Sequence, residues 1–127
     1  MKITQAMKTT RCLHTTILVS DLDKAEQFYT QVLGLIKSSK RSLQFSGTWY
    51  QIGEHQLHLI VHPNYVSPII NQEKWGRNPH LALAVDNIQQ AKVKLESQGY
   101  PIQMSASGRP ALFTQDPDGN IIELSQI

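Results

Sequence analysis

The sequence predicts an α+β fold built from two β-α-β-β-β modules that pack as a pair. Three observations support this prediction. The segment from His14 to Asp21 resembles a segment from His80 to Asp86, which begins 66 residues later. A helical pattern that ends at a glycine follows each segment, and short apolar runs complete each half. A constant spacing between similar segments indicates an internal repeat, so each half is expected to form one module.

The first module is predicted over residues 11–62. Apolar and β-branched residues at Leu13–Val19 favour a strand. Ser20 or Asp21 would cap the following helix, whose apolar residues recur at helical spacing as far as Gly34. Three further strands are expected at Ile36–Leu43, Phe45–Ile52 and Gln56–His62.

The second module is predicted over residues 80–127. It follows a linker at residues 63–79, where proline, glycine and asparagine recur. A strand is expected at His80–Val85 and a helix at Asn87–Ser97. The remaining strands are expected at Ile102–Met104, Ala111–Gln115 and Ile121–Ser125. The residues between the last two strands, Asp116-Pro117-Asp118-Gly119-Asn120, form a tight-turn sequence, because proline fixes φ and glycine tolerates a positive φ.

The composition is that of one globular domain, with 127 residues of which 17% are charged and 40% are apolar. Residues 1–10 are predicted to be a loose N-terminal extension and residues 11–127 a single domain. The net charge of +2 argues against a nucleic-acid partner. No apolar run is long enough for a membrane span, and Cys12 is the only cysteine, which fits a reducing compartment. We therefore expect a cytoplasmic protein without a membrane partner.

Histidine and glutamate residues occupy equivalent positions in the two modules. His14 and His80 open the first strand of each module, and His58 and Glu123 stand in the last strand. Their neighbours on the same strand face are small or apolar, so these faces are expected to point inward. A buried imidazole or carboxylate is costly unless a cation pairs with it. The pattern predicts one divalent metal held by His14, His80 and Glu123, with His58 as a fourth ligand or as a hydrogen-bond partner of a ligand.

Three segments resemble the vicinal oxygen chelate superfamily: His14 to Gly34, His80 to Asp86, and Asp116 to Glu123. This superfamily includes glyoxalase I, methylmalonyl-CoA epimerase, extradiol dioxygenases, fosfomycin-resistance thiol transferases and bleomycin-resistance proteins. The resemblance covers nearly all of residues 11–127. It implies that the paired modules form a cupped mixed sheet, the glyoxalase/dioxygenase fold, around a metal. It also implies metal ligands at His14, His58, His80 and Glu123, a set that the bleomycin-resistance branch lacks.

The resemblance implies a glyoxalase-like enzyme that binds two neighbouring oxygens of a small substrate at the metal. Lyase or isomerase chemistry is expected, with Glu123 as both a ligand and the catalytic base that helps to form an enolate or oxyanion. The metal could be Zn, Ni, Mn, Co or Fe. Four residues are expected to contact the substrate: His62, Tyr50, Trp49 and Arg109. Neighbours in one strand face opposite ways, so only one of Trp49 and Tyr50 can face the substrate.

The sequence departs from glyoxalase I at three positions. Leu18 replaces an arginine that holds the carboxylate of glutathione, and His58 and His62 replace a glutamate ligand and an asparagine. We therefore expect a poor lactoylglutathione lyase. Two alternative functions remain open, an Fe(II) extradiol-type dioxygenase and a non-catalytic small-molecule binding protein of the resistance type. The resemblance also implies a homodimer, whose metal site lies within one chain or between two.

Overall fold

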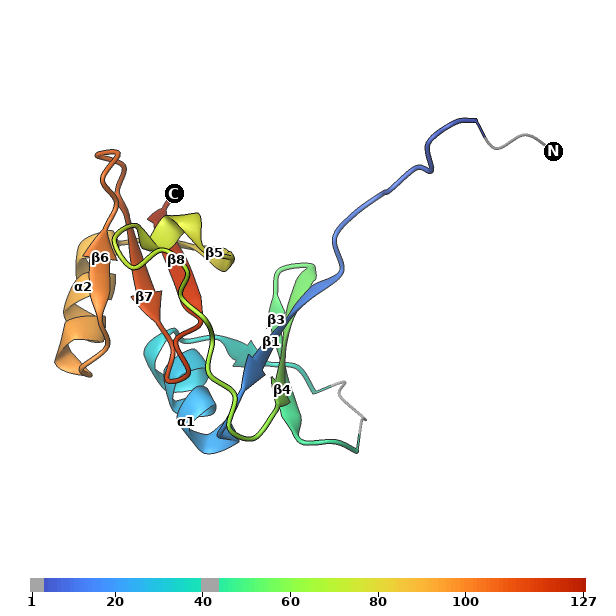
Figure 1. The fold of residues 1–127 in the computed structure, drawn as a ribbon, viewed down its shortest axis with the longest axis horizontal. Coiled ribbons are helices and arrows are strands. Elements are labelled where there is room, and N and C mark those ends of the chain that lie inside the picture. The colour runs from blue at the N-terminus through green and yellow to red at the C-terminus, as the bar shows by residue number, and fades with distance from the viewer. Residues whose placement is uncertain (1–3, 40–43) are drawn as a thin grey trace.

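The computed structural model describes residues 4–39 and 44–127, which form two successive modules (Figure 1). The first contains β1 (His14–Val19), α1 (Leu22–Glu26), a π-helical segment η1 (Gln27–Val32), β2 (Ile36–Lys37), β3 (Gly47–Ile52) and β4 (His55–Val61). A 3-10 turn η2 (Trp75–Arg77) precedes the second, which contains β5 (His80–Val85), α2 (Ile88–Ser97), β6 (Ile102–Met104), β7 (Ala111–Gln115) and β8 (Ile121–Gln126). This order confirms the predicted α+β fold and its repeated module.

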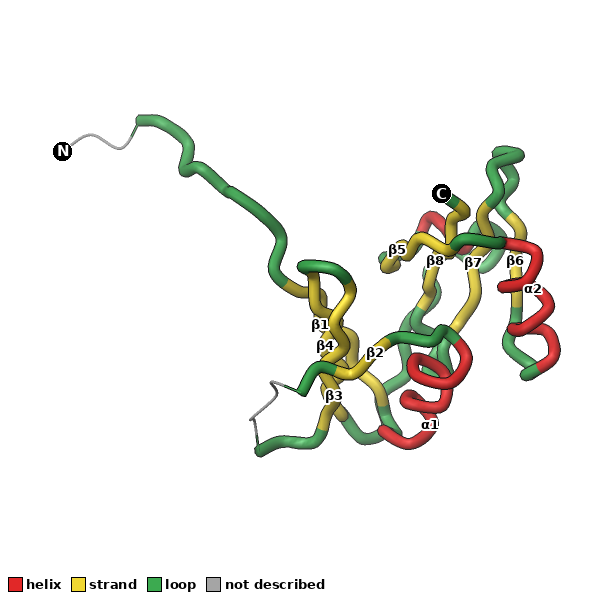
Figure 2. The backbone as a smooth tube through the Cα atoms, turned by 180° about the vertical axis from the view of Figure 1, so that it is seen from behind, coloured by secondary structure: helices red, strands yellow, loops and turns green. Residues whose placement is uncertain are grey.

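Each module forms its own four-stranded mixed sheet. The strand orders are β1-β4-β3-β2 and β5-β8-β7-β6. In each sheet the first strand runs parallel to the last, and the other neighbours are antiparallel. Among the described residues β1 and β5 have only one partner strand each, so both are sheet edges. Figure 2 shows the two groups of strands from behind, with α1 beside the second module.

Several element boundaries differ from those that the sequence predicts. The first helix is α-helical only to Glu26, and a wider π-type turn follows, in which the Leu33 N–H donates to the Phe28 carbonyl oxygen at 2.9 Å. This wider turn buries the consecutive residues Phe28 and Tyr29 completely. The strand expected at Ile36–Leu43 ends at Lys37, and residues 40–43 of that prediction lie outside the described residues.

The apolar core lies on one face of each sheet, next to the helices. Leu57 of β4 and Ile122 of β8 are buried on this face, in one cluster that extends through both modules. The rings of Phe28 and Tyr100 meet between the modules with centroids 4.9 Å apart. The apolar core is therefore continuous between the two modules, and burial of apolar area on this side stabilises both modules together.

The opposite sheet faces carry the predicted metal ligands, and in the single chain they are open rather than inward-facing. His14 of β1 and Ala82 and Ala84 of β5 are exposed. The cause is the alternation of strand residues, because the helices cover only the face to which Val19 and Leu83 point. An open face with ligand side chains is available to a substrate or to another protein chain.

The turn between β7 and β8 holds the two modules together. Its Asp118 carboxylate accepts hydrogen bonds from the Ser20 hydroxyl and from the Ser20 backbone N–H, the latter at 2.9 Å. The Asn120 side-chain amide donates to the carbonyl oxygen of Leu18 at 2.9 Å. These contacts attach the end of β1 to the β7–β8 turn of the second module.

The linker at residues 63–79 packs on the open face of the second sheet. The Trp75 N–H donates to Gln103 Oε1 at 2.9 Å, and Gln103 Nε2 donates to the Glu73 carbonyl oxygen at 2.9 Å. Gly76 lies so close to the Phe113 ring that a Cβ atom there would stand 2.6 Å from Phe113 Cζ. Only glycine fits this contact without a shift of the ring. This part of the linker therefore packs tightly against the second module.

Residues 4–13 form no helix or strand, and Figure 1 shows them running away from both modules. No helix in the described part of the chain is long and apolar enough to cross a membrane.

Candidate metal centre

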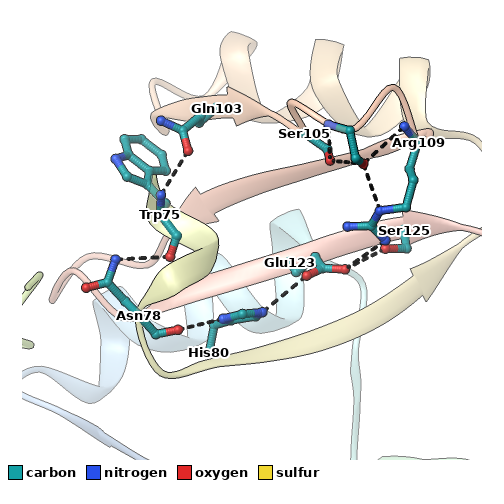
Figure 3. A network of polar contacts seen from close by, with 9 residues as sticks. Trp75, Asn78, His80, Gln103, Ser105, Arg109, Glu123 and Ser125 are labelled. Carbon is teal, nitrogen blue, oxygen red and sulfur yellow. Dashed lines mark hydrogen bonds and ion pairs between the residues drawn. The ribbon is translucent and has the colours of Figure 1, made fainter. Parts of the chain in front are cut away.

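His80 and Glu123 lie side by side on the open face of the second sheet (Figure 3). β5 and β8 are parallel neighbours, and their register places Ala82 opposite Glu123. His80 Nε2 is 3.1 Å from Glu123 Oε1, and the two side chains are 22% and 13% exposed. Two residues 43 positions apart in the sequence thus form one pair of potential ligands.

The contact made by the other ring nitrogen of His80, Nδ1, bears on the tautomer of the ring. His80 Nδ1 is 2.7 Å from the Asn78 carbonyl oxygen, which can only accept a hydrogen bond, so this contact favours a proton on Nδ1. In a neutral ring the lone pair of Nε2 then points at the Glu123 carboxylate. Two acceptors at this distance repel each other, and a cation between them or a second proton on the ring relieves that repulsion. This arrangement, with Nδ1 bound to a carbonyl, is typical of histidine metal ligands.

The second oxygen of the Glu123 carboxylate has its own partners. Ser125 Oγ donates to Glu123 Oε2 at 2.8 Å, and Arg109 Nη1 lies 3.7 Å from the same oxygen. Arg109 is itself directed by Ser107, whose hydroxyl accepts from Arg109 Nε at 3.0 Å. The β6–β7 hairpin therefore places the positive charge of Arg109 beside Oε2 of Glu123, while His80 contacts Oε1.

His14 and His58 form the corresponding pair on the first sheet. Their rings stack with centroids 4.1 Å apart and planes inclined by 13°. Trp49 stacks on His58 as well, with centroids 4.0 Å apart and planes inclined by 6°. Because β4 lies between β1 and β3, His58 is held between the two rings. Its Nε2 is 2.8 Å from Gln56 Oε1, an amide oxygen that only accepts, so Nε2 donates the hydrogen bond.

Stacked rings place a limit on metal binding by the first pair. The lone pair of an imidazole nitrogen lies in the ring plane, so two nearly parallel rings direct their lone pairs into separate planes. His14 and His58 therefore cannot both bind one ion unless one ring turns. Of the two, His58 is 8% exposed and held by Gln56 and Trp49, whereas His14 is exposed at the start of β1. The geometry favours His14 as the ligand and His58 as its fixed neighbour.

The four predicted ligands thus form two pairs rather than one cluster. His14 lies with His58 on the first sheet, and His80 lies with Glu123 on the second. Within residues 4–39 and 44–127 of a single chain, no three His, Cys, Asp or Glu side chains are grouped so that they could hold a metal ion. That these residues bind metal remains a prediction.

The predicted substrate-contact residues have different surroundings. Trp49 shares the open face with His58, and Arg109 reaches Glu123. Tyr50 does not lie on the open face, because it is fully buried among the core residues and its hydroxyl contacts Thr30 Oγ1 at 2.7 Å. Alternation in β3 allowed only one of Trp49 and Tyr50 to face the ligands, and Trp49 is that residue. His62 follows the end of β4, and its ring contacts Tyr65 with centroids 6.3 Å apart.

Sequence reasoning missed three residues that surround the ligand pairs. Asn78 supplies the carbonyl oxygen for His80, Gln56 binds His58, and Phe113 lies edge-on to His80 with ring centroids 5.6 Å apart. Asn78 lies in a segment rich in proline and glycine that indicates a linker and no more. Gln56 could have been found, because it precedes His58 by two residues and therefore shares its strand face.

The residues of the second sheet fit a divalent metal ion. Imidazole nitrogen and carboxylate oxygen suit Zn, Mn, Fe, Co and Ni ions. The 3.1 Å between His80 Nε2 and Glu123 Oε1 is close to the separation of about 3.0–3.4 Å expected for adjacent ligand atoms that each lie about 2.1 Å from one ion. The first sheet contributes further imidazole donors, of which His14 is the accessible one.

Comparisons with known proteins identify the family to which the sequence and the fold are related. Residues 11–124 match the family model of the Glyoxalase/Bleomycin resistance protein/Dioxygenase superfamily. The chain is 30% identical to a probable lactoylglutathione lyase of Vibrio cholerae, over 94% of this chain and 93% of that protein. It is 31% identical to the mitochondrial methylmalonyl-CoA epimerase of Homo sapiens, over 91% of this chain and 73% of that protein. The fold is similar to the crystal structure of a glyoxalase/dioxygenase from Nostoc punctiforme, with a TM-score of 0.77, 19% identity, and coverage of 98% of each chain.

Proposed function

Because the chain belongs to the glyoxalase/bleomycin resistance protein/dioxygenase superfamily, we propose that it is a metal-dependent enzyme with lyase or isomerase chemistry on a small substrate. The observation that carries the proposal is the pair of His80 and Glu123, whose facing acceptor atoms are 3.1 Å apart. Relatives named as a lyase and as an epimerase support a reaction of this kind.

Each residue of the proposed site has a defined task. His80 would bind the metal through Nε2, Glu123 through Oε1, and His14 would be the third ligand. A divalent metal ion would polarise two neighbouring oxygen atoms of the substrate as a Lewis acid. Glu123 Oε2 would move a proton at the adjacent carbon. Ser125 donates to this oxygen at 2.8 Å, so the carboxylate is held in place while it accepts and releases that proton.

A second copy of the chain would complete the site. The pair of His14 and His58 and the pair of His80 and Glu123 each form a half-site with two donor residues. A catalytic metal usually has three or more protein ligands. β1 and β5 are edge strands, and a pocket of about 410 Å³ separates them within the chain. His14 and Ala82 on the open faces are exposed. A symmetric homodimer could cover these edges and faces while it joins the first sheet of one copy to the second sheet of its partner.

The side chains around the two half-sites suggest the kind of substrate. Leu18 is on the His14 face of β1 and would form an apolar wall. Trp49 would contact the substrate from the first sheet and His62 from the end of β4. Arg109 would bind a carboxylate or phosphate next to Glu123. A small substrate such as a dicarbonyl, a hydroxy acid or a catechol fits these contacts better than a glutathione conjugate.

The test combines elemental analysis with an assay for proton transfer. Purified protein would be stripped of metal and reloaded with Zn, Ni, Mn, Co or Fe in turn. Small dicarbonyls and hydroxy acids would then be incubated in deuterated water, and NMR would follow exchange at the carbon next to the oxygens. Metal-dependent exchange supports the proposal. Saturable binding without exchange or product would make the protein a binding module instead, and failure of every metal to bind would refute the metal site.

The same three donors also suit a second candidate, an extradiol-type dioxygenase. Because Trp49 and Gln56 hold His58, three donors remain, namely His14, His80 and Glu123. Two histidines and one carboxylate suit Fe(II) with open coordination positions. Oxygen consumption by the Fe(II)-loaded protein in the presence of a catechol would identify this activity, and its absence would leave the lyase or isomerase proposal.

A further inference from the structure

Asn78 is buried in the linker, and its side-chain amide has a full set of hydrogen bonds. The residue is 5% exposed. Its Oδ1 accepts from the backbone N–H groups of Ile70 and Asn71 at 2.7 and 2.9 Å. Its Nδ2 donates to the carbonyl oxygens of Asn71 and Trp75 at 2.9 and 3.0 Å. The amide therefore satisfies both donors and both acceptor positions, and it ties together the loop at residues 70–78.

The backbone of Asn78 is fixed by the same loop. Its N–H donates to the Trp75 carbonyl oxygen at 3.1 Å, and its own carbonyl oxygen accepts from His80 Nδ1 at 2.7 Å. Figure 3 shows this connection from Trp75 through Asn78 and His80 to Glu123. The loop is held to the sheet by Gln103, which accepts from the Trp75 N–H at 2.9 Å. The position of one carbonyl oxygen beside His80 thus depends on the Asn78 amide.

The His80 ring has two competing neutral tautomers. With the proton on Nδ1, the ring donates to Asn78 and offers the Nε2 lone pair towards Glu123. With the proton on Nε2, the ring would donate to Glu123 Oε1, a favourable bond to a carboxylate, and Nε2 could no longer bind a metal. The carbonyl oxygen at 2.7 Å is the acceptor that favours the first tautomer.

We propose that Asn78 is a positioning residue: its buried amide holds the linker so that its own carbonyl oxygen keeps the proton of His80 on Nδ1 and leaves Nε2 free to bind a metal. The role in metal binding rests on the proposed function, whereas the tautomer of His80 does not. Partners that orient a metal-binding histidine typically change metal affinity by about 10- to 100-fold when they are removed.

The experiment compares Asn78→Ala with Asn71→Ala as a matched control. Asn71 Oδ1 accepts from the N–H groups of Glu73 and Lys74 at 3.2 and 2.8 Å, so the control also removes two hydrogen bonds from the loop. It leaves the amide of Asn78 and the backbone of Asn71 intact. A loss of general loop order would affect both variants, whereas the proposed role predicts an effect of Asn78→Ala alone.

The first readout is the nitrogen NMR spectrum of the His80 imidazole in the metal-free, full-length protein, recorded at alkaline pH. We expect the Nδ1–H tautomer in the wild type and in Asn71→Ala, and a shift towards Nε2–H in Asn78→Ala. An Nε2–H tautomer in the wild type would overturn the proposal, and this measurement needs no variant. An equal shift in both variants would overturn it too.

The second readout is Zn(II) affinity, measured by competition with a chelator. We expect Asn78→Ala to lower the affinity about 10- to 100-fold and Asn71→Ala to leave it near the wild-type value. Asn78→Ser, which keeps a small polar group at this buried position, provides a milder variant if Asn78→Ala does not fold, and its Zn(II) affinity should lie between those of Asn78→Ala and Asn71→Ala. Unchanged affinity in a folded Asn78→Ala protein would contradict the proposal. If the wild type binds no metal, the proposed function fails, and the tautomer still decides the role of Asn78.

Discussion

The Tyr29 hydroxyl donates a hydrogen bond to Asp116 Oδ2 at 2.7 Å, and this contact joins the helix of the first module to the last turn of the second. Both side chains are buried. Burial raises the pKa of the Asp116 carboxyl, while hydrogen bonds from Asn120 and Tyr29 act in the opposite direction. Burial and the charge of Asp116 raise the pKa of Tyr29, so its hydroxyl keeps the proton that it donates. The junction between the modules therefore contains a buried carboxylate whose charged form is stabilised by hydrogen bonds from Tyr29 and Asn120.

Tyr29→Phe should lower the free energy of unfolding by about 1–2 kcal/mol at neutral pH, because a buried carboxylate loses one donor. The substitution also removes a contact that lowers the pKa of Asp116, so this pKa should rise further. A carboxyl whose pKa is raised by folding favours the folded state at acid pH, and this contribution is lost as the pH rises through the folded-state pKa. The loss in the variant should therefore be smaller in acid than at neutral pH.

Urea unfolding followed by circular dichroism at about pH 7 and about pH 4 would measure both values. Tyr50→Phe is the control, because it also removes the hydrogen bond of a buried tyrosine hydroxyl, whose partner is the Thr30 hydroxyl at 2.7 Å and not a carboxylate. An equal loss at the two pH values would argue against a role of Asp116 ionisation.

His80→Ala and Glu123→Ala should each reduce bound metal sharply, because each removes a proposed ligand. His55→Ala is the matched control, since His55 Nε2 contacts Thr15 Oγ1 at 3.0 Å on the face away from the proposed site. Elemental analysis of protein reloaded with Zn(II) would give the metal content per chain. Full occupancy in both ligand variants would show that the metal binds elsewhere.

A mixed dimer should recover metal binding if the site lies between two chains. His14→Ala damages the first half-site and Glu123→Ala the second, so a mixed dimer has one intact site and one with both defects. Random mixing of equal amounts should restore roughly a quarter of wild-type binding, since half of the dimers are mixed and each has one of two sites. Restoration is measured by metal content after the variants are unfolded and refolded together.

A site within one chain would give no recovery in this mixture. Light scattering provides an independent check, because a species of only 14.4 kDa at working concentration would exclude the homodimer.

Turnover of the methylglyoxal–glutathione hemithioacetal should be weak with any metal. Leu18 stands where the resemblance to glyoxalase I places an arginine for the carboxylate of glutathione, and loss of such a charge-assisted contact costs about 1.5–3 kcal/mol. Affinity should fall by roughly one to two orders of magnitude. Thioester formation measured by absorbance with Zn(II) and Ni(II) tests this, and a kcat/KM above about 10⁴ M⁻¹s⁻¹ would show that other residues hold glutathione.

Local sequence patterns predicted most of the elements because short-range physics decides them. β5, β6 and β7 begin and end at the predicted residues, since β-branched and apolar runs favour strands in this context. Asn87 caps α2, as an Asx residue at the end of a strand should, with its side chain accepting from the Gln90 N–H. The predictions failed at η1, where wider π-type turns leave Phe28 and Tyr29 both buried in the core shared by the modules.

The candidate site was only partly predictable. The repeat identified His14, His80, Glu123 and His58, and their strand positions follow from the same spacing that identifies the modules. The contact of Arg109 with Glu123 depends on a hairpin that turns the guanidinium back over the sheet. No spacing rule connects the linker residue Asn78 to the ring of His80.

The sequence by itself determined the two modules, the strands that carry the ligands and the face that each ligand shares with its neighbours, because strand alternation and turn chemistry act over a few residues. Only the tertiary structure decided which partners meet. The register of β5 on β8 brings His80 to Glu123, and the register of β3 on β4 brings Trp49 to His58. Such pairs depend on packing between segments far apart in the chain, where helices cover one face of each sheet and leave the ligand face open.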